Sequence, residues 1–343
     1  MLRWYDRNRR ALPWRESRDP YRIWISEVML QQTQVDTVIP FYDRFLKVFP
    51  SVDTLARASL EEVLKVWENM GYYARARHLH AAARLIMDRF GGRFPNTKTD
   101  MLSLPGIGSY TAGAILSIAF GQPAAAPDSN IMRVLSRLYA LQEPVNTPYF
   151  RETLVTLAEN LVPKKKPGDF NQALMDLGAT LCRPKNPYCK RCPLDDLCLA
   201  RLQGIENNVP MMLKKRPLPH RNATAAVLRK GKKVLFVQRP SKGLLGGLWA
   251  FPGGFTEPEE TLQASLVRHV LKGVGLTIDV GKELASVDHA YTHFRVTTHA
   301  FICRPVNGAG PVQGVDRWRW LDAGEIREVA FSKMDRRILE LIL

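Results

Sequence analysis

The sequence predicts two regions of different fold class, a mainly α-helical region followed by a smaller α+β region. Apolar residues recur at helical spacing through roughly the first 200 residues. Four of the five cysteines are gathered within residues 182–198. After residue 220 the pattern changes to short alternating runs that are typical of strands. We therefore expect domains at residues 1–205 and 221–343. Residues 206–220 join them as a linker, because they contain three prolines, three consecutive cations and little periodicity.

The charge balance points to a polyanionic partner. The chain of 343 residues carries 49 Lys and Arg against 33 Asp and Glu, a formal net charge of +16. Such an excess favours nucleic acid over an anionic membrane. The N-terminus lacks an apolar core, and the longest apolar run, Ala112–Phe120, is too short to cross a bilayer. We expect a protein without a membrane segment, in a reducing compartment.

Within the helical region, residues 101–121 predict two helices joined by a tight turn. Pro105 prevents the first helix from continuing, and Gly106 and Gly108 suit a turn with positive φ and close backbone approach. Ser109 is the expected N-cap of a helix over Tyr110–Phe120. The free amides of such a turn lie at a helix N-terminus, which favours an anion such as a DNA phosphate. The alternative is an ordinary helix–helix turn.

Two acidic residues are candidates for catalysis. Glu27 lies among Trp24, Ile25 and Val28 in a stretch with helical spacing. Burial among such neighbours raises the pKa of a carboxyl group and suits it to act as a general acid. Asp128 follows a short loop that we expect to be exposed, just before a helix starting near residue 131. From the sequence alone, Glu27 would more commonly be a helix-surface residue and Asp128 an N-cap.

Two further tracts carry functional signals. Residues 71–77, GYYARAR, interleave aromatics with cations, which suits stacking on bases and binding of phosphates, although a half-buried helix face would look similar. Cys182, Cys189, Cys192 and Cys198 have the spacing C-x6-C-x2-C-x5-C. Thiols this close together converge on a metal centre or form strained disulfides, and their softness suits zinc or iron–sulfur.

These motifs together resemble a known enzyme family. LPGIG at 104–108, followed by Asp128, resembles the helix-hairpin-helix, Gly/Pro…Asp signature of base-excision DNA glycosylases. WISEVMLQQTQV at 24–35, GYYARAR and the cysteine spacing resemble the MutY type, the adenine glycosylases that act on adenine opposite 8-oxoguanine. The resemblance covers almost the whole chain. It implies a helix-hairpin-helix glycosylase fold with one 4Fe–4S cluster, held by the four cysteines in a structural role.

The resemblance also implies catalytic roles. Protonated Glu27 would give its proton to the imidazole-side ring nitrogen of adenine, and ionised Asp128 would stabilise the oxocarbenium ion. Tyr110 and Asn130 would hold Asp128 and the sugar. Tyr110 occupies the place of the lysine nucleophile in lyase relatives, so we expect base removal without efficient strand cutting.

Further positions match DNA contacts of the family. Each of them could also be an ordinary core aromatic or a polar surface residue. Trp14, Arg15 and Gln172 match the adenine pocket. Gln32 would wedge into the base stack, Tyr72 would intercalate beside the lesion, and Thr33 would contact 8-oxoguanine.

The last part of the chain resembles the Nudix fold. Its expected strands are 223–229, 232–238, 285–290, 294–303 and 315–321, with helices at 259–271 and from 333. Gly254, Glu260, Arg268, Gly275 and Leu276 fit the Nudix motif, whereas its three acidic positions hold His269, Lys272 and Gly273. Magnesium requires carboxylate oxygens there, so we expect no Mg²⁺ and no Nudix hydrolysis. In the family this domain recognises 8-oxoguanine, and Tyr291, Thr292 and His293 match the tip that does so.

The sequence therefore predicts a monofunctional adenine DNA glycosylase of base excision repair. Its substrate would be duplex DNA with adenine opposite 8-oxoguanine or guanine. We expect a monomer without membrane association, at the nucleoid in a bacterial cytoplasm. The alternatives are another helix-hairpin-helix glycosylase or lyase, a non-catalytic iron–sulfur DNA-binding protein, and a hydrolase of oxidised nucleotides.

Overall fold

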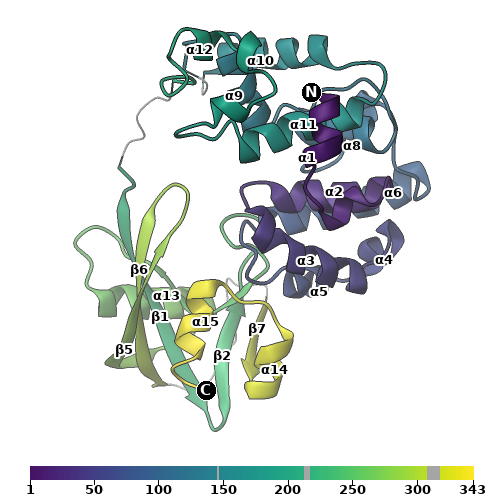
Figure 1. Ribbon diagram of the computed structural model, residues 1–343. Helices are drawn as coiled ribbons and strands as arrows, with labels where there is room; N and C mark the ends of the chain where they lie inside the picture. Colours follow the sequence, from purple (N-terminus) through teal and green to yellow (C-terminus); the bar gives the residue numbers. More distant parts are fainter. Residues whose placement is uncertain (145–146, 212–216, 307–316) are drawn as a thin grey trace. The chain divides into compact units, whose positions relative to one another are not determined.

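The computed structural model describes residues 1–144, 147–211, 217–306 and 317–343 (Figure 1). The chain divides into two compact units. The first contains Met1–Arg57 and His78–Lys215, and the second contains Ala58–Arg77 and Arg216–Leu343. Residues 58–77 are therefore grouped with the C-terminal part of the chain. This grouping was not evident from the sequence.

The first unit is mainly α-helical. Its longer helices are α2 (Pro20–Leu30), α3 (Val35–Val48), α8 (Ser109–Ile118), α9 (Ser129–Leu138), α10 (Pro148–Leu161) and α11 (Pro167–Thr180), and α6 (Ala74–Phe90) enters it from the second unit. Shorter helices are α1 (Leu2–Asn8), α4 (Val52–Arg57), α7 (Lys98–Leu102) and α12 (Leu199–Leu202). The 3₁₀ turns are η1 (Pro13–Arg15), η2 (Cys189–Arg191) and η3 (Asp195–Leu197).

Local sequence explains where the helices of the site begin. Asp19 caps α2, because its carboxylate accepts a hydrogen bond from the Tyr21 N–H and Pro20 occupies the first helical position. Asp128 caps α9 in the same way, through the Ile131 N–H. Two buried alanines and a proline precede it, so the loop before Asp128 is not exposed as expected.

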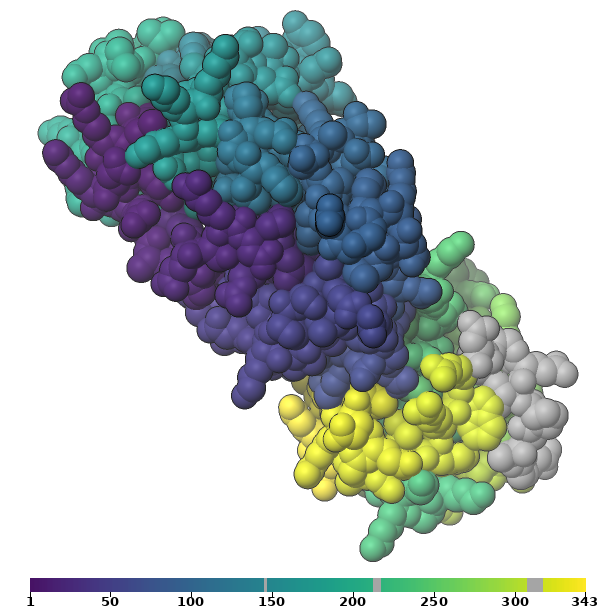
Figure 2. Space-filling model, turned by 90° about the vertical axis from the view of Figure 1, so that its right-hand side faces the viewer, coloured from purple at the N-terminus to yellow at the C-terminus, as the bar shows by residue number. Residues whose placement is uncertain are grey.

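The core of the first unit joins segments far apart in the sequence. Apolar residues of α9, α10 and α11 form one buried cluster, which includes Leu135, Leu154 and Leu177. Helix α11 also packs on α1 and α8. In Figure 2 the purple N-terminal residues and the teal residues of later helices form one continuous surface. The N-terminal segment is thus held beside α11, where both line the site described below.

The second unit contains a mixed sheet. Its strands are β1 (His220–Lys230), β2 (Lys233–Gln238), β3 (Trp249–Ala250), β4 (Gly253–Phe255), β5 (Ile278–Ala290), β6 (Arg295–Pro305) and β7 (Arg317–Leu321). The order is β3-β2-β1-β6-β5, with β4 also on β1 and β7 on β2. Strands β1 and β6 are parallel, and the β5–β6 pair is antiparallel.

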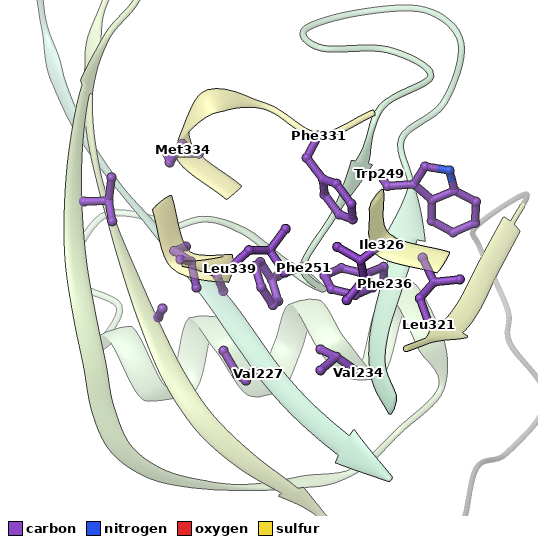
Figure 3. Close-up of a cluster of buried hydrophobic side chains, with 14 of the residues drawn as sticks. Val227, Val234, Phe236, Trp249, Phe251, Leu321, Ile326, Phe331, Met334 and Leu339 are labelled. Atoms are coloured by element: carbon purple, nitrogen blue, oxygen red, sulfur yellow. The ribbon is translucent and has the colours of Figure 1, made fainter. Parts of the chain in front are cut away.

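Helices cover both faces of this sheet. Alternate residues of β1 enter two different clusters, as period-two side-chain placement requires. Ala225 and Val227 pack with residues of α14 (Ala323–Glu328) and α15 (Lys333–Leu339), as Figure 3 shows for Val227, Ile326 and Leu339. Ala226 and Leu228 pack on α13 (Leu262–Val274). The remaining helix, α5 (Leu60–Val66), comes from the N-terminal part of the chain.

Several boundaries differ from the sequence-based expectations. Helix α13 starts at Leu262 instead of 259, because Thr261 caps it through the Ala264 N–H and Glu259 has a left-handed φ of 62°. Gly108, not Ser109, is the N-cap of α8. The expected linker ends earlier, since His220 already belongs to β1, and its residues 212–216 lie outside the described part. Residues 315–316 of the last expected strand also lie outside it.

Among the residues that the structure describes, no helix has both the length and the apolar character that a membrane span requires.

Candidate active site

One cavity of the first unit brings together the predicted catalytic and base-pocket residues. Its volume is about 930 Å³, and its walls come from η1, α2, α8, α9 and α11. The lining contains nine of the predicted residues: Trp14, Arg15, Glu27, Gln32, Thr33, Tyr110, Asp128, Asn130 and Gln172. Segments separated by more than a hundred residues in the chain therefore form one pocket around two carboxyl groups.

Glu27 lies on α2 at the wall of this cavity. Glu27 is only 5% exposed, and the Tyr110 hydroxyl donates a hydrogen bond to its Oε2 atom. The pKa of the Glu27 carboxyl is raised to about 7, chiefly by desolvation; the Tyr110 hydrogen bond and the charge of Arg15 lower it, and the charge of Asp128 raises it. The raised pKa agrees with the sequence-based expectation. A carboxyl of this kind can hold a proton near neutral pH.

Asp128 faces the same cavity from the start of α9. Its carboxylate accepts hydrogen bonds from the Ile131 N–H at 2.7 Å and from the Asn130 amide nitrogen at 2.8 Å. Burial raises the pKa of Asp128, while these two donors and the charge of Arg133 lower it. Asp128 is therefore both the helix cap and a wall of the cavity, so the two interpretations of the sequence are compatible.

Tyr110 has a different partner from the one expected. We expected it to hold Asp128 together with Asn130, but its hydroxyl donates to Glu27. Desolvation, followed by the charge of Glu27, raises the pKa of Tyr110 well above its ordinary value. The phenol therefore stays neutral and acts as a hydrogen-bond donor.

Arg133 is a site residue that the sequence analysis missed. Its guanidinium donates to the Asn130 side-chain oxygen at 2.8 Å, to the Gly178 carbonyl at 2.8 Å and to the Cys182 carbonyl at 2.8 Å. A Cβ at Gly178 would lie 2.6 Å from the Asn130 Cβ, so only glycine allows this approach of α11. The sequence signal that could have identified Arg133 is its spacing, because a residue three positions after Asn130 lies on the same face of the helix.

The base-pocket candidates line the same cavity. Arg15 makes two hydrogen bonds to the carboxylate of Asp176, at 2.6 Å and 2.8 Å, and Arg10 pairs with the same carboxylate at 2.6 Å. Asp176 is completely buried, and its pKa is lowered because the two guanidinium groups outweigh the effect of burial. Trp14 packs edge-on against Tyr42 with ring centroids 5.4 Å apart. One buried carboxylate therefore holds the guanidinium groups of both Arg10 and Arg15 in place.

The turn before α8 is only partly as expected. Gly106 has φ 76°, and a Cβ there would lie 2.7 Å from the His78 Cβ. Gly108 has an extended backbone with φ −98°, so our expectation of a positive φ at this position is wrong. No atom lies within 4 Å of an added Cβ at Gly108. The position that a side chain would occupy there is therefore open at the start of α8.

Two exposed residues occupy left-handed backbone positions next to tracts predicted to contact DNA. Gln32, directly after α2, is exposed with φ 59°, and Tyr72, in the second unit, is 47% exposed with φ 49°. Few side chains adopt this conformation without a structural reason. Thr33 stays close to the backbone of α2, because its hydroxyl donates to the Gln31 carbonyl at 3.4 Å.

The four clustered cysteines are all free and half-buried, and they line one small cavity of about 30 Å³. Arg137, 2% exposed, contacts the Cys182 Sγ at 3.3 Å and donates to the carbonyls of Arg183 and Pro184. In the described ranges, no group of three or more His, Cys, Asp or Glu side chains is placed to share one metal ion. The four thiols surround a space instead, and a 4Fe–4S cluster, in which each cysteine binds a different iron, requires such a donor set.

The β5–β6 hairpin carries the remaining predicted contacts. Thr292 and His293 are exposed at its tip. Tyr291 is folded back, with its ring 4.9 Å from Phe294 and 4.6 Å from His289, and burial raises its pKa to about 12. The hairpin therefore exposes Thr292 and His293, and Tyr291 only in part.

Among the residues that fit the Nudix motif, the carboxylate of Glu260 is already paired. Arg268 binds Glu260 through two hydrogen bonds of 2.7 Å, which lowers the pKa of Glu260 to about 2. The imidazole of His269 lies 2.8 Å from the Phe255 carbonyl. In this structure Glu260, Arg268 and His269 therefore make contacts within the domain.

The sequence and the structure resemble those of DNA repair enzymes. Residues 25–159 match the HhH-GPD superfamily of base excision DNA repair proteins, and residues 223–341 match the NUDIX domain. The human adenine DNA glycosylase is 36% identical over 99% of this chain and 73% of its own length. That of Buchnera aphidicola subsp. Baizongia pistaciae is 39% identical over 74% and 72% of the two chains.

A solved structure supports the fold of the first region. A thermostable thymine-DNA glycosylase is 36% identical, with a TM-score of 0.54, over 59% of this chain and 93% of its own. The similarity therefore reaches only part of the chain, whereas the human relative matches nearly all of it.

Proposed function

Because this chain belongs to the adenine DNA glycosylase family, we propose that it removes adenine paired with 8-oxoguanine or guanine in duplex DNA. The chain is a DNA glycosylase of base excision repair, and the choice of base pair is the proposal. The observation that carries it is the cavity of about 930 Å³ in which Glu27 and Asp128 face the same space. An extruded nucleobase would bind there, since a glycosylase must take its target base out of the stack.

Glu27 would act as the general acid. Its pKa of about 7 keeps a large fraction of the carboxyl protonated at neutral pH. Proton transfer to the imidazole-side ring nitrogen makes adenine a better leaving group. The Tyr110 hydroxyl is hydrogen-bonded to the same carboxyl and stabilises its ionised form after the proton has left. Glu27 can then accept a proton from the attacking water.

Asp128 would stabilise the positive charge that develops on the sugar. Burial raises the pKa of Asp128, but the Ile131 N–H, the Asn130 amide and the charge of Arg133 lower it and so favour the ionised form. Cleavage of an N-glycosidic bond with oxocarbenium character needs such a carboxylate. Asn130 and Arg133 would act as positioning residues, because they fix the orientation of Asp128.

The remaining contacts follow from placement. Trp14, Arg15 and Gln172 would hold adenine, and the turn of Gly106 and Gly108 would bind a phosphate through its amides. Gln32 and Tyr72 would enter the base stack. Thr33, Tyr291, Thr292 and His293 would recognise 8-oxoguanine, and we propose that the Nudix-like domain binds no Mg²⁺.

One 4Fe–4S cluster would be held by Cys182, Cys189, Cys192 and Cys198. When bound, it would supply a redox-capable centre, but base removal requires no electron, so its role here is structural. It would hold the basic loop at residues 184–191 in place, and Arg137 already ties this loop to α9. Iron and acid-labile sulfide analysis of the purified protein tests this, and stoichiometric zinc would contradict it.

The direct test uses four matched duplexes, with A opposite 8-oxoguanine, A opposite G, T opposite G, and A opposite T. We expect alkali-labile sites only in the first two, and no strand breaks without hot alkali, because Tyr110 cannot form a Schiff base. Cleavage of the T:G duplex would favour a thymine glycosylase, to which the first region is also similar. Full adenine release by Asp128→Asn would refute the role of Asp128.

We also propose that the protein works as a monomer at the bacterial nucleoid. The net charge of +16 supports association with duplex DNA.

A further inference from the structure

Residues 58–77 connect two parts of the chain in an unexpected way. They lie within the range that matches the HhH-GPD superfamily, yet they pack as part of the same compact unit as residues 216–343. Helix α5 begins with a capping box between Ser59 and Glu62 and buries Val63 and Leu64. The segment then runs through a tight turn that ends at Tyr72 and Tyr73, before α6 begins at Ala74.

The first anchor of this segment is Glu68. Its carboxylate is buried and accepts hydrogen bonds from Arg336 Nε at 2.7 Å, from the Phe331 N–H at 3.0 Å and from Lys65 Nζ at 2.9 Å. Arg336 also donates to the Val329 carbonyl at 2.9 Å. These hydrogen bonds fix Glu68 against α15 and the residues before it. A buried, charged and fully bonded pair of this kind holds its partners in one geometry.

Hydrogen bonds of Tyr73 and Glu61 form a second anchor. The Tyr73 hydroxyl donates to the Phe331 carbonyl at 3.3 Å and accepts from the Asn69 N–H at 3.2 Å. The indole N–H of Trp249 donates to Glu61 at 2.7 Å. Phe331 and Trp249 are fully buried members of the hydrophobic cluster of the α/β region, which Figure 3 shows. Residues 58–77 are therefore bonded to residues of the hydrophobic core of that region, and not only to its surface.

Between the anchors the backbone is strained. Asn69, Gly71 and Tyr72 have φ values of 73°, 77° and 49°. The Gly71 carbonyl accepts from Trp67 Nε1 at 3.0 Å and from Arg75 at 3.3 Å, and the Arg75 guanidinium stacks 5.2 Å from the Tyr72 ring. Such strain persists only where surrounding contacts determine it. The result is a fixed turn that exposes the Tyr72 ring, next to the buried Tyr73.

We infer that the C-terminal α/β region has a second role beyond lesion recognition: through Arg336, Glu68 and the Phe331 backbone it positions Tyr72 for insertion into the DNA stack. This rests on the proposed function, in which Tyr72 intercalates. Glu68 and Arg336 are positioning residues, since they act through Tyr72. Because the anchor does not touch the opposite base, it acts alike on A opposite 8-oxoguanine and A opposite G.

The test compares the full-length wild type with Glu68→Ala, Tyr72→Ala and the double variant. Single-turnover adenine release is measured on both duplexes, and 2-aminopurine beside the 8-oxoguanine reports unstacking by its fluorescence. We expect Glu68→Ala to slow release by about 10-fold to about 100-fold on both duplexes and to reduce the fluorescence change. We also expect the double variant to be no slower than Tyr72→Ala, because both substitutions remove the same contribution, the insertion of Tyr72.

Controls separate the anchor from general damage. Lys233→Met removes an exposed pair with Glu325 in the same unit and should leave both readouts at the wild-type level. If Glu68→Ala does not fold, Glu68→Gln and Arg336→Lys are compared in the same way, with rescue expected from Arg336→Lys. Wild-type rates and fluorescence in folded Glu68 variants, or losses that multiply in the double variant, would overturn the inference. If the wild type releases no adenine, the proposed function fails, and the fluorescence comparison still tests the anchor.

Discussion

Two buried glutamates, one in each unit, have opposite pKa shifts. Glu27 and Glu68 are similarly buried, with exposures of 5% and 9%. The pKa of Glu27 is raised to about 7 by desolvation, whereas that of Glu68 is lowered below its ordinary value despite desolvation. Glu68 has two cationic donors and one backbone N–H, but Glu27 meets a neutral hydroxyl and a neighbouring acid. Partners, more than burial, decide which carboxyl can hold a proton.

The comparison separates two roles that the residue type alone does not. A glutamate with its charge fully paired gains nothing from protonation and serves to hold chain segments together. One that is buried with a neutral hydrogen-bond donor, as Glu27 is, is poised to give up or take a proton, which is costly for stability but useful for catalysis. The active-site cavity and the anchor of residues 58–77 thus use the same type of side chain, a glutamate, for opposite purposes.

The largest expected effect is on catalysis by Glu27. Glu27→Gln keeps the shape and removes the proton donor, so we expect single-turnover adenine release to fall by about 10²-fold to about 10⁴-fold, with little change in DNA affinity. Glu159→Gln, which removes an exposed partner of Lys98, is the matched control. Release by Glu27→Gln within a few-fold of the wild type would show that the raised pKa has no catalytic use.

The pH dependence of adenine release sharpens the same contrast. Glu27 must be protonated to act as an acid, so the rate should fall by about tenfold for each pH unit above about 7. The Tyr110 hydrogen bond lowers the pKa of Glu27, so Tyr110→Phe should move this decline to higher pH. Single-turnover rates between about pH 5 and about pH 9 measure both. A decline at the same pH in the two proteins would remove Tyr110 from the account.

These features differ in how far the sequence predicts them. Apolar neighbours three and four residues away indicate that Glu27 is buried, because helix packing is local information. Asp128 looked exposed, since the alanines before it become buried only through contacts with residues distant in the sequence. The pairing of Glu68 with Arg336, 268 residues further along the chain, left no local signal at all.

The same distinction applies to the folds. The helix–turn–helix at the hairpin and the succession of strands and helices in the C-terminal region were predicted from period and turn residues, but the order of the strands in the sheet was not. The caps at Gly108 and Thr261 moved the helix starts by a few residues, as is usual for boundaries. The partner of Tyr110 and the chain from Asn130 through Arg133 to Cys182 depend on tertiary packing. The sequence predicted Asn130 and Cys182, at the two ends of this series of hydrogen bonds, but not Arg133 between them.

Stability should respond to Glu68 in the direction opposite to Glu27. Glu68→Ala leaves Arg336 partly buried without its carboxylate, so we expect a loss of about 3–5 kcal/mol and a lower melting temperature at neutral pH. The pKa of Glu68 is lowered on folding, so its contribution is present above its ordinary value of 4.5 and disappears as pH falls below it. Thermal melts of both proteins should therefore converge at acid pH. Equal melting temperatures at pH 7 would contradict the paired role.

The smallest expected effect is a gain in stability from Glu27→Gln, because the neutral amide removes the cost of a buried charge. The pKa of Glu27 rises on folding from 4.5 to about 7, so the wild type is fully stabilised below the lower value and loses stability as pH rises towards 7. Above that, the difference should reach about 3 kcal/mol in favour of the variant. Melting temperatures at about pH 5 and about pH 8 test this. A gap that does not widen with pH would mean that Glu27 is charged in the folded protein at both values, and that the contrast with Glu68 lies elsewhere.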